Sequence, residues 1–195
     1  MNLFFDTETT GKADFRLPPD AKCQPRIVQL AALLTTFDGQ EMASLNVIIK
    51  PDGFTIPKEA SDIHGITTEL ALGYGVEEIS ALRVFDQMLM RAQTAVAHNF
   101  QFDHLVLSRR SIIRNRALDY RAFCTMRAMT PICKLPNTSG YSDYKRPKLQ
   151  EAYKHCYGVE FDGAHDAMAD VRACAKVYFW LQDRRVPIAN EDVKV

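Results

Sequence analysis

Two acidic side chains at the end of an apolar run constrain this chain most strongly. The run Leu3-Phe4-Phe5 resembles a buried strand, and Asp6 and Glu8 follow directly. Side chains alternate along a strand, so Asp6 and Glu8 point to the same side. Two adjacent carboxylates repel each other, and a protein interior does not tolerate them without a cation. A divalent metal ion is the simplest such cation. The alternative is a strand that ends in a polar turn with two solvated acids.

Length and composition indicate one globular domain. The chain has 195 residues, of which 47% are apolar and 25% are charged, values typical of a soluble protein with a substantial core. We expect a single domain over 1–195, with a core over about 1–184 and a short tail over 185–195. The 24 basic and 24 acidic residues cancel, so any nucleic-acid contact must depend on local basic patches.

The sequence argues against a membrane-spanning protein, a secreted protein and a zinc-binding protein. No apolar run approaches the roughly 20 residues that span a bilayer, and charge appears at residue 6, before a signal peptide could form. The five cysteines are odd in number and widely spaced, without a Cys-x-x-Cys pair. We therefore expect small buried cysteines in a reducing compartment, the cytoplasm, rather than a zinc site or disulfide framework.

The next segments predict a hairpin. After an irregular, proline-containing loop over 12–25, two apolar runs, 26–37 and 41–50, flank Asp38-Gly39. Asp-Gly between apolar runs is a strong hairpin signal. The chain thus begins with three strands, the last two antiparallel.

Strands and helices then alternate, which predicts an α/β fold with one mixed sheet. We expect a connector over 51–68 and a short helix that Thr67 caps. Further helices are expected over 76–92, 100–114, 148–157 and 166–184, with Asn99 as the N-cap of the second and Gly158 closing the third. We also expect a strand over 94–97, a strand and short helix within 122–133, and a loop over 136–147.

Two later segments carry groups that could join the first acids. Asp103 lies in the first turn of its predicted helix, where a carboxylate is also favoured for stability alone. Asp166 is a natural N-cap, and Asp170 shares its helix face. His165 precedes this helix in a loop that could move, and its simpler interpretation is a surface histidine.

Four stretches in one order, FDTETTG, IHGIT, AHNFQFD and HDAMAD, resemble motifs of the DEDDh exonucleases. These form the DnaQ-like group of the ribonuclease H-like superfamily. The resemblance extends from residue 3 to about 184, and it implies a mixed central sheet in which parallel strands follow the antiparallel hairpin, with flanking helices. The matching residues are Asp6, Glu8, Asp103, His165 and Asp170.

The resemblance implies hydrolysis of phosphodiester bonds from the 3′ end with release of nucleoside 5′-monophosphates. Two divalent ions, Mg²⁺ or Mn²⁺, would clamp the displacement. Asp6 would bridge both ions, Glu8 and Asp170 would complete one site, and Asp103 would serve the other through water. His165 would be the general base, since histidine suits proton transfer near neutral pH.

Motif positions also imply contacts to the terminal nucleotide. These are Thr9, His64, Asn99 and Phe102, of which Phe102 either stacks on a base or packs in the core. Basic clusters within 109–116 and 145–148 either contact phosphates or form solvated surfaces. The segment 17–23 resembles an inserted loop that either shapes substrate access or has no catalytic role.

Substrate and partners stay open at the level of sequence. The expected substrate is single-stranded DNA or a frayed 3′ end, and a 3′→5′ exoribonuclease acting on short or structured RNA is the alternative. A non-catalytic nucleic-acid-binding subunit is remote, because all five family positions are filled. Proofreading would need a separate DNA polymerase, whereas repair or turnover would not, and the chain could be a monomer or a homodimer.

Overall fold

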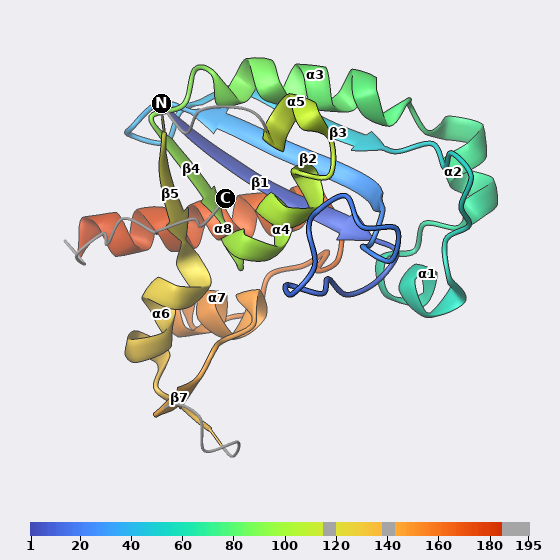
Figure 1. Ribbon diagram of the computed structural model, residues 1–195. Helices are drawn as coiled ribbons and strands as arrows, with labels where there is room; N and C mark the ends of the chain where they lie inside the picture. The colour runs from blue at the N-terminus through green and yellow to red at the C-terminus, as the bar shows by residue number, and fades with distance from the viewer. Residues whose placement is uncertain (115–119, 138–142, 185–195) are drawn as a thin grey trace.

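A mixed five-stranded sheet forms the centre of the molecule (Figure 1). The computed structural model describes residues 1–114, 120–137 and 143–184. The strand order is β3-β2-β1-β4-β5; β1 is antiparallel to β2, β2 is antiparallel to β3, and β1, β4 and β5 run parallel. This arrangement confirms the ribonuclease H-like mixed sheet. The strands are β1 Asn2–Thr9, β2 Ile27–Thr35, β3 Glu41–Ile48, β4 Thr94–Ala97 and β5 Arg121–Cys124.

Helices cover both faces of the sheet, with α3 along one face and α8 along the other (Figure 1). The adjacent phenylalanines of β1 show why both faces are buried. The Phe5 ring meets Phe85 of α3 with centroids 5.4 Å apart, and the Phe4 ring meets Tyr178 of α8 at the same separation. Helices α4 and α5 pack with α3, and α6 and α7 pack with α8. The bounds are α3 Glu78–Leu89, α4 Phe100–Leu107, α5 Ser111–Arg114, α6 Thr125–Cys133, α7 Leu149–Tyr157 and α8 Ala167–Asp183.

Helix ends follow the predicted caps in three places. Thr67 accepts a hydrogen bond from the Leu70 amide and begins α2 (Thr68–Tyr74). Asp166 accepts from two amides at the start of α8. Gly158 ends α7 in the left-handed conformation, with φ of 78°, which glycine adopts without steric cost.

The prediction of a single helix over 100–114 was wrong. Helix α4 ends at Leu107, and α5 starts only at Ser111. The Arg109 amide bonds to the Val106 carbonyl, an i→i−3 bond that tightens and closes the last turn. Leu107 and Ile113 both reach the core beside α3, so the break lets two short helices bury their apolar residues.

Two segments expected to be irregular contain short elements. The connector over 51–68 contains α1 (Lys58–His64), and the segment 136–147 contributes to a small ladder of β6 (Leu135–Pro136) and β7 (Tyr144–Lys145). Helices and strands as short as these carry too little periodic pattern to be recognised in the sequence. The predicted tail over 185–195 lies outside the described residues.

The cysteines are free, as predicted, but they are not uniformly buried. Cys124 and Cys174 are buried, Cys133 and Cys156 are half-buried, and Cys23 is exposed. The prediction of a buried thiol was therefore wrong for Cys23, which lies in the loop after β1. Among the described residues, no helix is both long and apolar enough to cross a bilayer.

Candidate active site

The first two acids lie at the carboxyl end of β1, the central strand of the sheet. Asp6 pairs in register with Ala31, and Glu8 pairs with Gln29 of β2. Both acids are half-buried and project from the face of the sheet that α8 covers, as the period of two requires. Helix α8 presents small buried residues, including Ala167 and Ala173, to this face. The helix can therefore lie close to the two carboxylates.

The start of α8 brings a third acid and a histidine to Glu8. One ligand atom from each of Glu8, His165 and Asp170 lies within 4.8 Å of the other two. The His165 amide donates to Asp170 Oδ2 at 3.3 Å, and His165 has a left-handed backbone with φ of 70°. That conformation is uncommon outside glycine. The turn directs the exposed imidazole toward the acids.

Asp103 reaches the cluster from α4 and is held differently. Its side chain is only 2% exposed, and its Oδ1 accepts two hydrogen bonds from Thr7, from the amide at 3.0 Å and from the hydroxyl at 2.8 Å. Thr7 lies between the two acids of β1. Its bonds therefore join α4 directly to the strand that carries Asp6 and Glu8.

The electrostatics show that the carboxylates share one site. Burial raises the pKa of Asp6 well above its usual value, and the charges of Asp103, Asp170 and Glu8 raise it further. Burial likewise raises the pKa of Glu8 to about 7 and that of Asp170 to about 6. Burial raises the pKa of Asp103 to about 7, although the bonds from Thr7 oppose the rise. Four carboxylates that resist ionisation together are the environment that a divalent cation stabilises.

The donor set fits hard divalent cations. The cluster supplies carboxylate oxygens from three separate segments and one imidazole, and oxygen ligands are those that Mg²⁺ and Mn²⁺ prefer. The structure thus brings Asp6, Glu8, Asp103, His165 and Asp170 together as predicted, while their individual roles stay predictions.

Two predicted nucleotide contacts, Thr9 and His64, lie beside the acids. Thr9 ends β1, and its hydroxyl donates to the Gly11 carbonyl at 2.8 Å. Burial lowers the pKa of His64, the Thr9 backbone opposes this, and the charge of His165 lowers the pKa further. His64 Nδ1 accepts from the Ile66 amide at 3.1 Å, whereas its buried Nε2 has no well-formed hydrogen-bond partner among the described residues. His64 thus lies near both Thr9 and His165.

Asn99 and Phe102 lie one turn or less from Asp103 on α4. Asn99 precedes the helix, but its side chain makes no capping bond, so the predicted cap was wrong. Its φ of 77° is left-handed, whereas a capping side chain needs an extended backbone. Phe102 is half-buried against the core that α3 and α4 share. Core packing therefore explains the buried part of the Phe102 ring.

His98 was missed, although it belongs to the AHNFQFD motif. Its Nε2 donates to the Pro147 carbonyl at 3.0 Å, and its Nδ1 accepts from the Thr125 hydroxyl at 2.9 Å. A carbonyl only accepts, so the proton is on Nε2 of a neutral ring. Burial accordingly lowers the pKa of His98 to about 4. Its hydrogen bond to Pro147 connects the end of β4 to the segment before α7. The position of His98 between a predicted strand and an asparagine was the sequence signal that could have identified it.

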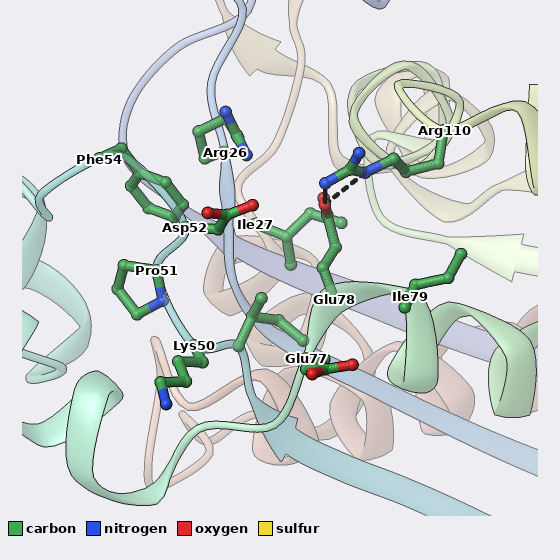
Figure 2. Close-up of a pocket in the computed structure, with 11 residues that line it drawn as sticks. Arg26, Ile27, Lys50, Pro51, Asp52, Phe54, Glu77, Glu78, Ile79 and Arg110 are labelled. Carbon is green, nitrogen blue, oxygen red and sulfur yellow. Dashed lines mark hydrogen bonds and ion pairs between the residues drawn. The ribbon is translucent and has the colours of Figure 1, made fainter.

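A cleft of about 530 Å³ lies between the start of β2 and the start of α3, and none of the five candidate site residues lines it (Figure 2). Its charges largely compensate. Arg110 pairs with Glu78, and the Arg26 guanidinium lies 4.7 Å from the centre of the Phe54 ring. The lining carries three cations and three acids, and the candidate phosphate contact Arg109 donates to the Ala21 carbonyl. These charged lining residues are Arg26, Lys50, Asp52, Glu77, Glu78 and Arg110.

Comparison with known families shows the family of this chain. Residues 3–178 match the sequence model of the family RNase_T, described as Exonuclease. The chain belongs to this exonuclease family. The match includes all five residues of the cluster, and it confirms the DEDDh-type family that the four motifs predict. No curated protein sequence matches the chain.

Solved structures show the same fold for this exonuclease chain. E. coli exonuclease I in complex with a dT13 oligonucleotide superposes with a TM-score of 0.73 at 24% identity, over 94% of this chain and 41% of that chain. Exonuclease I from Methylocaldum szegediense gives a TM-score of 0.69 at 20% identity, over 94% of this chain and 40% of that one. A complex of exonuclease I with the SSB C-terminus gives a TM-score of 0.71 at 22% identity, over 94% of this chain and 41% of that one. The chain thus spans about two fifths of the exonuclease I chains that it matches.

Proposed function

We propose that this chain is a metal-dependent 3′→5′ exonuclease that removes nucleoside 5′-monophosphates from single-stranded DNA or frayed 3′ ends. The observation that carries the proposal is the convergence of Asp6, Glu8, Asp103 and Asp170, with His165 beside them. The exonuclease family and the oligonucleotide complexes of E. coli exonuclease I support it. We further propose that residues 1–184 act as one exonuclease domain.

The acids would hold two divalent ions, Mg²⁺ or Mn²⁺. Asp6 would contact both, Glu8 and Asp170 would hold one, and Asp103 would act on the other through water. Bound there, such ions supply Lewis-acid chemistry that activates the attacking water and stabilises the leaving oxygen. The raised pKa values of these acids support the assignment, because cations relieve the repulsion that the carboxylates otherwise suffer.

His165 would take the proton of the attacking water. Its side chain is exposed, so the proton can pass on to solvent after each cycle. The hydrogen bond from its backbone amide to Asp170 keeps the imidazole beside the acids. Thr9 and His64 would orient the terminal nucleotide, and Asn99 and Phe102 would contact the strand from α4.

The decisive experiment digests 5′-labelled single-stranded DNA and RNA of matched sequence with Mg²⁺, Mn²⁺ or a chelator. We expect a ladder that shortens from the 3′ end on DNA, no reaction with the chelator, and RNA digestion slower by about tenfold or more. The Asp6→Asn variant is the control for contaminating nucleases. Internal cuts, or digestion that survives the chelator, would contradict the proposal, and faster digestion of RNA than of DNA would move the substrate to RNA.

A further inference from the structure

Gln29 is a buried polar side chain in an otherwise apolar strand. It is 5% exposed in β2, whose other core residues include Leu30 and Leu33. A buried amide needs hydrogen-bond partners, because an unpaired one costs free energy. Gln29 lies directly opposite Glu8 in the β1–β2 register, and directly paired residues share a face of the sheet. The amide therefore projects toward the start of α8, beside the acids.

Both ends of the Gln29 amide are bonded. Its Oε1 accepts from the Ala167 amide at 3.3 Å, and its Nε2 donates to Asn46 Oδ1 at 2.9 Å. The same Nε2 lies 3.4 Å from Asp166 Oδ2. A carboxylate could not replace this group, because it has no proton to donate and would repel Asp166. The side chain thus links β2, β3 and the first residues of α8.

The bonded residues of α8 are those next to the candidate site. Asp166 caps the helix and Ala167 is its first residue, while His165 directly precedes them and Asp170 follows by one turn. The apolar face of α8 sets the distance between helix and sheet, but apolar packing has little directional preference. Hydrogen bonds are directional, so Gln29 fixes the position of the helix start along the sheet.

We propose that Gln29 is a positioning residue of the exonuclease site: it holds the start of α8 so that Asp170 and His165 stay within reach of Glu8. The inference rests on the proposed function, because it assumes that these residues bind a divalent cation. Partners behind metal ligands typically change metal affinity or activity by about 10–100-fold when removed.

The test compares Mn²⁺ binding by the wild-type chain and Gln29→Met, a variant of similar size without hydrogen-bonding groups. Free Mn²⁺ is measured by electron paramagnetic resonance, and thermal unfolding of the metal-free proteins is measured in parallel. We expect the Mn²⁺ Kd of Gln29→Met to rise about tenfold or more. The Mn²⁺ concentration for half-maximal DNA digestion should rise in parallel.

Thr35→Val is the matched control on the same strand. Thr35 is 1% exposed, and its hydroxyl donates to the Thr36 carbonyl at 2.8 Å, at the end of β2 far from Gln29. This variant also loses a buried hydrogen bond, but its Mn²⁺ Kd should equal that of the wild type. A purely structural role of Gln29 would give the same result for Gln29→Met, with lower thermal stability and unchanged Mn²⁺ affinity, and would overturn the proposal.

A second variant keeps the test valid if Gln29→Met does not fold. Gln29→Asn keeps the amide but shortens the side chain by one methylene, so it cannot reach Ala167. It should also weaken Mn²⁺ binding, and wild-type affinity in Gln29→Asn would reject the inference. The wild-type chain separates the two proposals: if it binds no Mn²⁺, the proposed function fails, and if all variants bind alike, only the role of Gln29 fails.

Discussion

Two helices bring an acid to β1, and they hold it in opposite ways. Asp103 of α4 is almost fully buried and accepts two hydrogen bonds from Thr7. Asp170 of α8 is half-buried, and its bond comes from the amide of His165 in an exposed turn. One carboxylate is therefore fixed by the fold itself. The other belongs to a segment that solvent can reach.

The difference assigns separate tasks to the two sides of the site. On the α4 side, hydrogen bonds hold a carboxylate in place before any cation arrives, which lowers the cost of reorganisation. On the α8 side, an exposed histidine can exchange its proton with water. Four experiments test this division of tasks.

The largest effect is expected for His165→Ala. Loss of a general base typically lowers the rate by about 10²–10⁴-fold, and we expect kcat on single-stranded DNA to fall within this range. Binding of Mn²⁺ and DNA should persist, because the four acids remain. His155→Ala, which removes another exposed histidine on α7, is the control, and it should leave kcat unchanged. Wild-type turnover in His165→Ala would remove this residue from the mechanism.

The next effect compares Asp103→Asn with Asp170→Asn in metal-free protein at pH 8. Both substitutions remove a charge that burial disfavours, so both should raise Tm. In separate assays with Mn²⁺, both should abolish DNA digestion. The rise should be larger for Asp103→Asn, about 5 °C or more, because Asp103 is more deeply buried and the amide oxygen can still accept from Thr7. Differential scanning calorimetry measures the Tm of both variants. A larger rise in Tm for Asp170→Asn would contradict the expectation that Asp103 is the more costly buried charge.

A third effect is the pH dependence of stability without metal. The pKa values of Glu8 and Asp103 are raised to about 7 and that of Asp170 to about 6, so the folded chain keeps protons that the unfolded chain has lost. Their contribution to stability is fully present below about pH 4 and is lost as pH rises to about 7.

Urea unfolding at several pH values checks this expectation. The free energy of unfolding of the metal-free wild type should decrease between pH 5 and pH 7.5, and added Mn²⁺ should restore it at the upper end. The decrease should be smaller in Asp103→Asn, which lacks one of the three groups. A wild-type profile that rises over this interval would contradict the raised pKa values.

The last experiment tests the bond from Thr7 to Asp103 with the variant Thr7→Val. The variant loses the hydroxyl bond to Asp103 but keeps the amide bond. We expect the free energy of unfolding at pH 7.5 to fall by about 1.5–3 kcal/mol, the range for hydrogen bonds to charged groups. Thr9→Val, which removes a bond from a residue of the same strand to the neutral Gly11 carbonyl, should cost about 1 kcal/mol. Equal losses would show that Thr7 does not hold a charged Asp103.

The sequence predicts those features that depend on local chemistry. The alternation around Asp6 and Glu8 places both acids on one face, and Asp38-Gly39 predicts the hairpin from turn geometry alone. Asp166 was identified as a helix cap because its side chain competes for the first amides. These predictions need only neighbouring residues, and the structure confirms them.

Features that depend on distant contacts were not predicted. The left-handed backbone of Asn99 is not visible in the sequence. Gln29 appears as one polar residue in an apolar run, and only the fold shows that its partner Ala167 is 138 residues away. The bond between Thr7 and Asp103 likewise spans 96 residues. Spacing along the chain cannot reveal which buried polar groups satisfy each other.

The loop after β1 shows how an insertion can be accommodated. The buried Gln24 amide bonds both the amide and the carbonyl of Asp14, and it also donates to the Leu17 carbonyl. A segment that satisfies its own backbone in this way is self-contained, and Arg109, which lies between α4 and α5, donates to its Ala21 carbonyl. Such a loop can be shortened or exchanged as a cassette without rebuilding the sheet, and this makes it the natural place for members of the family to diverge.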